Sequence, residues 1–193
     1  MHSNSEVIMK NFAELKQLFE QANSEFLKKE KWLFANKVSE RTLCGALMLH
    51  LHDIIAQDPS YDGYYTDVEY NRNKGSIKTI YKTIHGPNEQ IIKINCDLIL
   101  HSRGEHPKQD NLIAIEMKKS TRRANEKKKD RDRLIALTKD SFDYVWAWDG
   151  KTLPEHVCRY ELGVYYEINY EAQKVLIEYY RKGAKVKSYD ISI

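Results

Sequence analysis

The sequence predicts an α/β protein in which a mixed β-sheet core is flanked by helices, with an extra helix at the N-terminus. Three observations lead to this fold class. The first 56 residues carry apolar side chains at helical spacing, the middle of the chain changes to strand-like segments, and another helical segment precedes a closing pair of strands. This order of elements is typical of a sheet covered by helices. At 193 residues, the chain is long enough for one domain with a sizeable core and short for two.

Three segments have helical periodicity. The first carries apolar side chains three or four residues apart, at Ile8, Phe12, Leu15, Phe19, Ala22 and Phe26. The second covers residues 38–56, and Asp58-Pro59 ends it. The third covers residues 121–138, which are basic at the start and apolar near the end. We expect residues 1–36 to form a helical extension and residues 37–193 to form the main domain.

The remaining apolar and β-branched segments are strand candidates. Residues 64–70 and 77–84 are separated by a turn, and residues 143–148 form a short strand. The two most apolar candidates are residues 91–101 and 111–117, joined by a polar loop that contains Gly104 and Pro107. Residues 159–169 and 173–181 form a closing hairpin.

Composition and motifs narrow the functional classes. Hydrophobic residues at 41% and aromatic residues at 11% indicate a globular protein. No apolar run reaches the roughly 18 residues of a membrane-spanning helix, and the N-terminus lacks the pattern of a secretory signal. Cys44, Cys96 and Cys158 are odd in number and widely spaced, which argues against a disulfide framework and a thiolate zinc site. The motifs GxxxxGK[ST] and GxSxG are absent. We therefore expect a cytoplasmic protein.

Asp97 and Glu116 lie on the two most apolar strand candidates. If the loop between them closes a hairpin, residues whose numbers sum to about 213 face each other, which pairs Asp97 with Glu116. Antiparallel pairing would bring the two carboxylates side by side, with Cβ atoms roughly 5 Å apart. Lys118 follows Glu116 by two residues, so it projects to the same face of the strand.

This trio of charges suits metal-assisted chemistry. Two crowded carboxylates repel each other, and a hard cation such as Mg²⁺ relieves the repulsion because it prefers carboxylate and water oxygens. A bound metal polarises a phosphodiester and lowers the pKa of a coordinated water. Lys118 would orient that water, help to deprotonate it or stabilise the transition state. Asp97, Glu116 and Lys118 therefore predict a phosphodiester-hydrolysing site that uses Mg²⁺, with Mn²⁺ able to substitute.

Glu40 is a candidate third carboxylate. It precedes Leu43, Leu47 and Ile54 by three, seven and fourteen residues, which places it on the apolar side of its helix. A charge that faces a core needs a partner or a metal. The alternative is that Glu40 stands at the helix N-terminus, where an acid favours the helix dipole and leans into solvent.

Several motifs around these residues carry a family resemblance. The segments CDLILH and NLIAIEMKKS, preceded by Glu40-Arg41 and the strand DVEYNR, resemble the PD-(D/E)XK nuclease superfamily. More narrowly, the chain is similar to an uncharacterised bacterial group with EYNR and IEVKKS-like motifs. DRDRLIALT at residues 130–138 and YELGVYYE at residues 160–167 fit that group's DxxRLxxLT and YxLGLxxE patterns. The resemblance spans about residues 38–181, with Cys96 in the position of the motif's proline.

The resemblance implies a restriction-endonuclease-like fold with a four-stranded mixed core flanked by helices. It implies that Asp97 and Glu116 bind the metal, that Lys118 is catalytic, and that Glu40 has an accessory role as a catalytic and metal-binding residue. The implied activity is Mg²⁺-dependent cleavage of DNA, in phage defence, restriction or repair. The alternative is a non-catalytic nucleic-acid-binding or assembly subunit that keeps the nuclease fold.

The segment 118–133 holds nine Lys and Arg residues against three Asp and Glu residues. Such clusters meet phosphates, although a solvated helix face is the commoner explanation. Lys119, Arg122 and Arg123 follow Lys118 directly, so we expect them to contact a nucleic-acid backbone, with Arg72 as a further contact. We expect DNA rather than RNA as the partner. Specificity would come from a partner protein or from a homodimer formed through the N-terminal helix, and no membrane association is expected.

Overall fold

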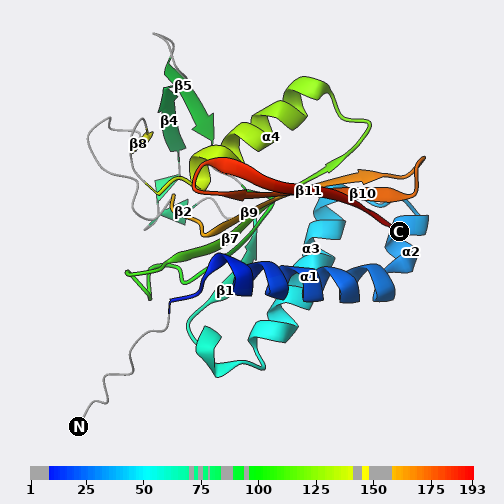
Figure 1. Cartoon of the computed structure of the whole chain (residues 1–193), viewed down its shortest axis with the longest axis horizontal. Helices are drawn as coiled ribbons and strands as arrows, with labels where there is room; N and C mark the ends of the chain where they lie inside the picture. Colours follow the sequence, from blue (N-terminus) through cyan, green and yellow to red (C-terminus); the bar gives the residue numbers. More distant parts are fainter. Residues whose placement is uncertain are drawn as a thin grey trace.

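The computed structural model in Figure 1 has a mixed α/β architecture, in which helices flank a six-stranded, mostly antiparallel sheet. The structure describes residues 9–69, 72–73, 76–77, 79–83, 89–93, 96–140, 145–147 and 158–193. Side chains are described for residues 9–69, 96–140 and 158–193. None of the helices in these ranges has both the length and the apolar character needed to cross a membrane.

Three helices form where the apolar periodicity predicts them, and capping side chains fix the start of two of these. Helix α1 (Phe12–Lys29) begins with a capping box between Asn11 and Glu14. Helix α2 (Lys31–Ala35) follows directly. Helix α3 (Glu40–Ile55) begins after Ser39, whose side chain accepts a hydrogen bond from the Thr42 N–H. A single 3-10 turn, η1 (Pro59–Tyr61), lies beyond α3, and α4 (Ala124–Leu137) lies within the predicted third helix.

The main sheet has the strand order β1-β6-β7-β9-β10-β11. Its strands are β1 (Tyr65–Val68), β6 (Leu98–His101), β7 (Asn111–Lys119), β9 (Leu162–Asn169), β10 (Lys174–Arg181) and β11 (Ala184–Ser192). All neighbours are antiparallel except β7 and β9, which are parallel. A parallel step needs a crossover connection, and α4 lies in the segment that joins these two strands.

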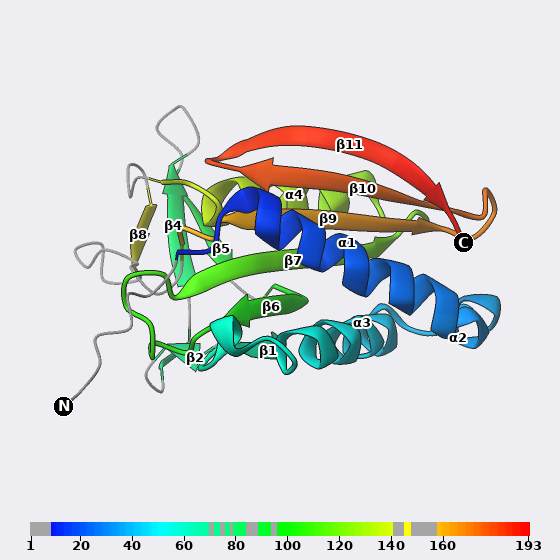
Figure 2. The ribbon, with the colours of Figure 1, turned by 60° about the horizontal axis from the view of Figure 1, so that its bottom comes forward.

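Helices cover both faces of this sheet (Figure 2). Leu98, Leu100, Ile113 and Ile115 share a buried cluster with α1 and α3, whereas their neighbours Ile99 and Ala114 pack with Leu134 and Leu137 of α4. This division follows from the alternation of side chains along a strand. The odd-numbered residues of β6 and the even-numbered residues of β7 therefore face α4.

The strands differ from the sequence prediction in two places. The run 91–101 is not one strand: β5 (Glu89–Lys93) pairs with β4 (Thr79–Thr83), whereas β6 belongs to the main sheet. A continuous apolar run cannot reveal this break, because backbone pairing decides which sheet each half joins. Strand β11 was not predicted at all, because its side chains are mostly exposed and it lacks an apolar core pattern.

The other strand predictions are confirmed within the described residues. The closing hairpin consists of β9 and β10, and β8 (Val145–Ala147) lies inside the predicted 143–148 strand and pairs with β4. The turn that separates the first two strand candidates, expected at residues 71–75, needs correction, because β2 (Arg72–Asn73) lies within it and pairs with β3 (Ser76–Ile77). Residues 74 and 75 of that turn lie outside the described residues.

The apolar side of α1 is not available for a homodimer interface. Leu15, Phe19, Ala22 and Phe26 are fully buried against the chain's own α3 and sheet. A homodimer formed through the N-terminal helix would therefore have to use other side chains of this helix, and this dimerisation stays a prediction. The division into residues 1–36 and 37–193 stays a prediction.

Candidate functional site

Strands β6 and β7 pair in the register that the sequence predicts. Leu98 pairs with Ile115, Ile99 with Ala114 and Leu100 with Ile113, so each pair of numbers sums to 213. Asp97 directly precedes β6, and its Oδ2 accepts a hydrogen bond of 2.8 Å from the Met117 N–H. The backbone pairing therefore places the Asp97 side chain against the part of β7 that carries Glu116 and Lys118.

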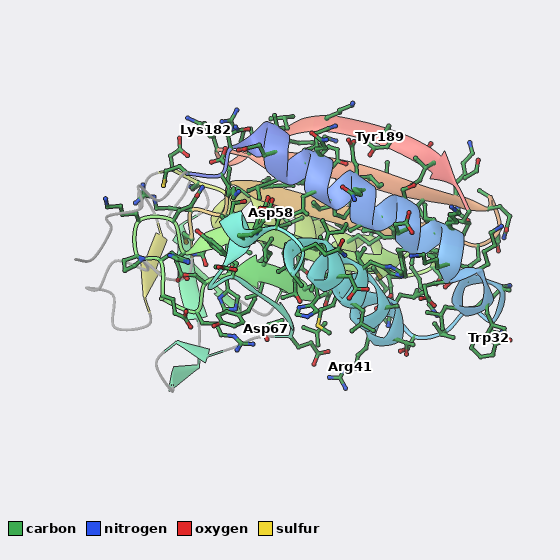
Figure 3. The ribbon with its side chains drawn as sticks, turned by 90° about the horizontal axis from the view of Figure 1, so that it is seen from below. Trp32, Arg41, Asp58, Asp67, Lys182 and Tyr189 are labelled. Carbon is green, nitrogen blue, oxygen red and sulfur yellow. The ribbon has the colours of Figure 1, made fainter. Side chains whose placement is uncertain are left out.

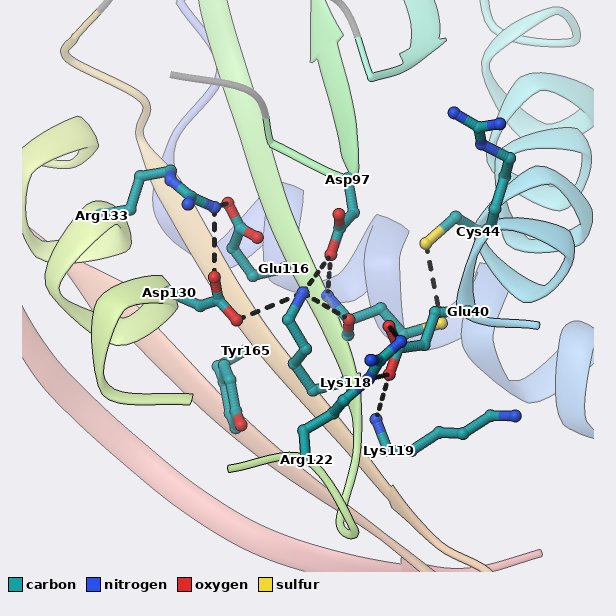
Figure 4. A network of polar contacts seen from close by, with 12 residues as sticks. Glu40, Cys44, Asp97, Glu116, Lys118, Lys119, Arg122, Asp130, Arg133 and Tyr165 are labelled. Atoms are coloured by element: carbon teal, nitrogen blue, oxygen red, sulfur yellow. Dashed lines mark hydrogen bonds and ion pairs between the residues drawn. The ribbon is translucent and has the colours of Figure 1, made fainter. Parts of the chain in front are cut away.

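The three predicted site residues converge on the face of the sheet that α4 covers (Figure 4). Lys118 Nζ lies 3.4 Å from Asp97 Oδ2 and 3.3 Å from Asp130 Oδ2 of α4. Glu116 forms an ion pair with Arg133, also from α4. The structure thus brings Asp97, Glu116 and Lys118 together, and it adds Asp130 and Arg133 to the group.

Glu116 is a fully buried carboxylate with one oxygen unsatisfied. Its side chain is 0% exposed, Oε1 accepts from Arg133, and Oε2 has no hydrogen-bond partner in the described structure. Burial raises the pKa of Glu116 to about 8, with a further contribution from the nearby Asp97 charge, and Arg133 opposes this rise. An orphaned buried oxygen is costly unless something occupies the position it faces.

Lys118 is held as a positively charged donor. Burial acts to lower its pKa, but the charges of Asp97, Asp130 and Glu116 outweigh burial and raise the pKa above the ordinary lysine value. Its side chain is 16% exposed, so the ion pairs are only partly screened by water. The ammonium also donates to the Met117 carbonyl oxygen at 3.2 Å.

Sequence reasoning assigned no role to Asp130 and Arg133. The available signal was the DxxR spacing within DRDRLIALT, because residues three apart on a helix share a face. In the structure both side chains reach the strand residues, and Arg133 NH1 also lies 3.3 Å from Asp130 Oδ1. Their contact with Glu116 and Lys118 depends on how α4 is rotated over the sheet, which the sequence pattern does not specify.

Glu40 occupies the first turn of α3, on the other side of the sheet from α4. Its Oε1 accepts from the Lys119 N–H and from Arg122 Nε, both at 2.9 Å, and its Oε2 accepts from Arg122 NH2 at 3.1 Å. Burial opposes the change, but these bonds from Arg122 and Lys119 lower the pKa of Glu40. Glu40 is therefore a partnered carboxylate, only 16% exposed, that fixes the end of β7 against α3.

A pocket of about 210 Å³ is lined by both Glu40 and Asp97, whereas Glu116 and Lys118 do not line it. Asp97 lines one part of it and Glu40 another, and Arg41 and Arg122 contribute cationic side chains. Arg41 lies exposed at the surface (Figure 3). Its Nε donates to Glu69 Oε1 at 2.9 Å, which holds the guanidinium in place. The pocket is thus lined by acidic side chains and by two arginines that a ligand from solvent could contact.

The predicted nucleic-acid contacts have different surroundings. Lys119 donates from Nζ to the Lys37 carbonyl oxygen at 2.9 Å, and Arg122 is paired with Glu40. Arg123 is the exposed N-cap residue of α4. The backbone of Arg72 lies in β2, but its side chain is outside the described residues. Lys119, Arg122 and Arg123 therefore all lie close to the end of β7, and their contact with a nucleic acid stays a prediction.

The donor set is compatible with Mg²⁺ bound through two carboxylates. In the described ranges, no group of three or more His, Cys, Asp or Glu side chains is arranged to hold a metal ion. Mg²⁺ is commonly bound by one or two carboxylates together with waters and substrate phosphates. Glu116 Oε2 supplies one unsatisfied oxygen, and Asp97, directly before β6, accepts from the Met117 N–H and from Lys118 through Oδ2.

Comparison with protein-family models, curated proteins and solved structures finds no match for this chain.

Proposed function

We propose that this protein is a divalent-metal-dependent nuclease that hydrolyses phosphodiester bonds, with DNA preferred over RNA. The observation that carries the proposal is the convergence of Asp97, Glu116 and Lys118 on one face, with Glu116 Oε2 buried and unsatisfied. A purely structural core gives no reason to gather these charges, because each buried ion costs desolvation energy. The mixed sheet formed by β1, β6, β7 and β9, between α3 and α4, is consistent with a restriction-endonuclease-like core.

Each residue has a part in this chemistry. Asp97 and Glu116 would hold Mg²⁺, which supplies Lewis acidity to the phosphodiester when bound. The Lys118 ammonium, held by Asp97 and Asp130, donates hydrogen bonds to the attacking water or to the phosphoryl oxygens as their charge grows. Glu40 supports the end of β7 and faces the same pocket as Asp97, from which an accessory contact to the metal shell is available.

The basic residues beside the site favour a nucleic-acid substrate. Arg122 lines the pocket, Lys119 ends β7 and Arg123 caps α4, and contacts from such side chains to phosphates add affinity without reading sequence. We propose a role in phage defence, restriction or repair, with sequence specificity supplied by a partner protein.

A non-catalytic nucleic-acid-binding or assembly subunit is the second candidate. The observation that favours it is that Lys118 and Arg133 already neutralise much of the carboxylate charge within the chain. Such a subunit would keep the fold and the basic surface but would not need a metal.

The deciding experiment measures cleavage of single- and double-stranded DNA and RNA with Mg²⁺, Mn²⁺ or EDTA, for the wild-type protein and Asp97→Ala. The nuclease should cut at least one substrate in Mg²⁺ or Mn²⁺ and none in EDTA, and Asp97→Ala should be inactive. Isothermal titration with Mn²⁺ in the absence of nucleic acid supplies a second readout. No cutting together with no metal binding would reject the nuclease in favour of the subunit, whereas binding without cutting would indicate a missing activator.

A further inference from the structure

The face of α4 that packs on the site presents two charged side chains to two different site residues. Arg133 contacts Glu116, and Asp130 contacts Lys118. We propose that Arg133 and Asp130 are positioning residues of the metal site, Arg133 for the ligand Glu116 and Asp130 for the ammonium of Lys118. This inference rests on the proposed nuclease function and extends it to two residues that no sequence motif assigned to the chemistry.

Arg133 determines which oxygen of Glu116 is available. Its NH1 group binds Glu116 Oε1, so the carboxylate is held with Oε2 as its open oxygen. Glu116 lies on the face that also carries the buried residues Ile99, Ala114 and Leu134, and the uncharged Cys96 thiol interacts with its carboxylate. Without the guanidinium, the Glu116 side chain would lose its orienting donor in this environment, and both oxygens would compete for the metal position. A ligand that is held in one orientation binds more tightly because its freedom is already lost.

Asp130 determines where the Lys118 ammonium stands. Asp130 is buried, and its Oδ2 lies 3.3 Å from Lys118 Nζ on the side away from Asp97 (Figure 4). A metal that binds Asp97 competes with Lys118 for that carboxylate. Asp130 provides the anchor that keeps the ammonium in place when this competition arises, so Lys118 can still donate to the substrate.

The spacing on α4 explains why one helix can serve both purposes. Asp130 and Arg133 are three residues apart, and Arg133 NH1 lies 3.3 Å from Asp130 Oδ1. Residues Arg131 and Asp132, between them, point to different partners: Arg131 pairs with Glu178 of β10, and Asp132 pairs with Lys128. The same short segment therefore contains a charge-matched control for each proposed positioning residue.

The test compares Arg133→Met, Arg133→Lys and Asp130→Asn with the control variants Arg131→Met and Asp132→Asn. Mn²⁺ affinity is measured by isothermal titration without nucleic acid, and kcat and KM are measured on the substrate that the wild type cuts. Arg133→Met should lose about 10- to 100-fold in Mn²⁺ affinity, and Arg133→Lys should recover part of that loss. Asp130→Asn should lose about 10- to 100-fold in kcat while KM and Mn²⁺ affinity stay close to the wild-type values. Both controls should resemble the wild type.

The outcomes separate this inference from the proposed function. If the wild type binds Mn²⁺ and cuts, but the three variants behave like the controls, the positioning roles are rejected and the nuclease stands. If the wild type neither binds Mn²⁺ nor cuts, both fail. Arg133→Met leaves a buried carboxylate without its cation and can fail to fold, which a thermal melt detects. In that case the other two variants decide the question. The inference is overturned if Arg133→Lys, which keeps the charge, has wild-type Mn²⁺ affinity and Asp130→Asn has wild-type kcat.

Discussion

At the scale of single residues, the candidate site is a set of charges that the protein interior could not hold separately. Glu116 and Asp130 are buried, and they are balanced by Lys118 and Arg133, which are themselves largely covered. Removing one charged side chain of such a group leaves its partner as an unpaired buried charge. The free-energy cost of that unpaired charge exceeds the net stabilisation that the intact ion pair provides. Substitutions here are therefore expected to affect stability as well as activity, and tests of function need a folding control.

Lys118→Ala should abolish most cleavage while leaving metal binding in place. The substitution removes the donor to the water or phosphoryl oxygens but keeps Asp97 and Glu116, so kcat should fall by about 100-fold or more. Cleavage assays and Mn²⁺ titration on the folded variant check this, with Lys29→Ala on the exposed side of α1 as the control. Undiminished cleavage would remove Lys118 from the mechanism.

Asp67 should make the stability of the protein depend on acid pH. Burial acts to raise its pKa, but hydrogen bonds from His101 and Arg103 lower it below the ordinary value. Because the folded pKa is below the unfolded value of about 4, the contribution of Asp67 to stability is present above that pH and disappears as pH falls through the folded pKa.

The expected free-energy difference between the wild type and Asp67→Asn is about 1–3 kcal/mol at neutral pH. Urea unfolding at a series of pH values should show this difference shrinking as pH falls below about 4, where the unfolded chain takes up a proton at Asp67, and vanishing once pH is below the lowered folded pKa. A difference that stays constant across the series would mean that ionisation of Asp67 does not contribute to folding.

At the scale of elements, the site depends on how closely α4 lies on the sheet. Gly163 of β9 pairs with Ala114 of β7, and both are beneath α4. A Cβ atom at residue 163 would stand 2.9 Å from Thr138 Cγ2 and 3.0 Å from Tyr180 Cβ. The small residues in these two strands therefore allow α4 to approach, and this approach brings Asp130 and Arg133 to Lys118 and Glu116.

Gly163→Ala should destabilise the protein by about 1–3 kcal/mol, because the added methyl group forces α4 or β10 to shift. Gly45→Ala on α3 is the matched control, since a Cβ at residue 45 has nothing within 4 Å and alanine favours a helix. Urea unfolding of both variants measures the effect. Equal stability of Gly163→Ala and the wild type would show that α4 can adjust without cost.

At the scale of the whole molecule, the N-terminal helix belongs to the core that supports the site. Phe19 of α1 makes edge-to-face contacts with Tyr166 of β9 and Tyr179 of β10, with ring centroids 6.5 and 6.0 Å apart. Tyr166 also donates to Asn23 Oδ1 at 2.9 Å, a buried contact between α1 and the sheet. Strand β9, which pairs with the end of β7, is thus packed directly against α1.

Phe19→Ala should lower the free energy of unfolding by about 3–5 kcal/mol, because it removes a fully buried ring from this interface. Trp32→Ala is the control: this side chain is 69% exposed, at the surface in Figure 3, and its loss should change stability by less than about 0.5 kcal/mol. Both are measured by urea unfolding. A small effect at Phe19 would indicate that residues 37–193 form a core that is independent of α1.

The sequence by itself determined the parts of the protein that depend on local pattern. Apolar spacing located α1, α3 and α4, and the loop between residues 101 and 111 set the register in which β6 pairs with β7. That register follows from a simple geometric rule, so the approach of Asp97 to Glu116 and Lys118 could be predicted without a structure.

Only the tertiary structure decided which distant elements complete the site. The break between β5 and β6, the added strand β11, the pairing of Glu40 with Arg122, and the contacts of Asp130 and Arg133 all depend on packing between segments far apart in the chain. Periodicity fixes which side of a helix is apolar, but its rotation and height over a sheet are set by the volumes of side chains on both surfaces. The contacts of Asp130 and Arg133 with β7 therefore depend on how α4 packs on the sheet, and a local sequence pattern cannot predict them.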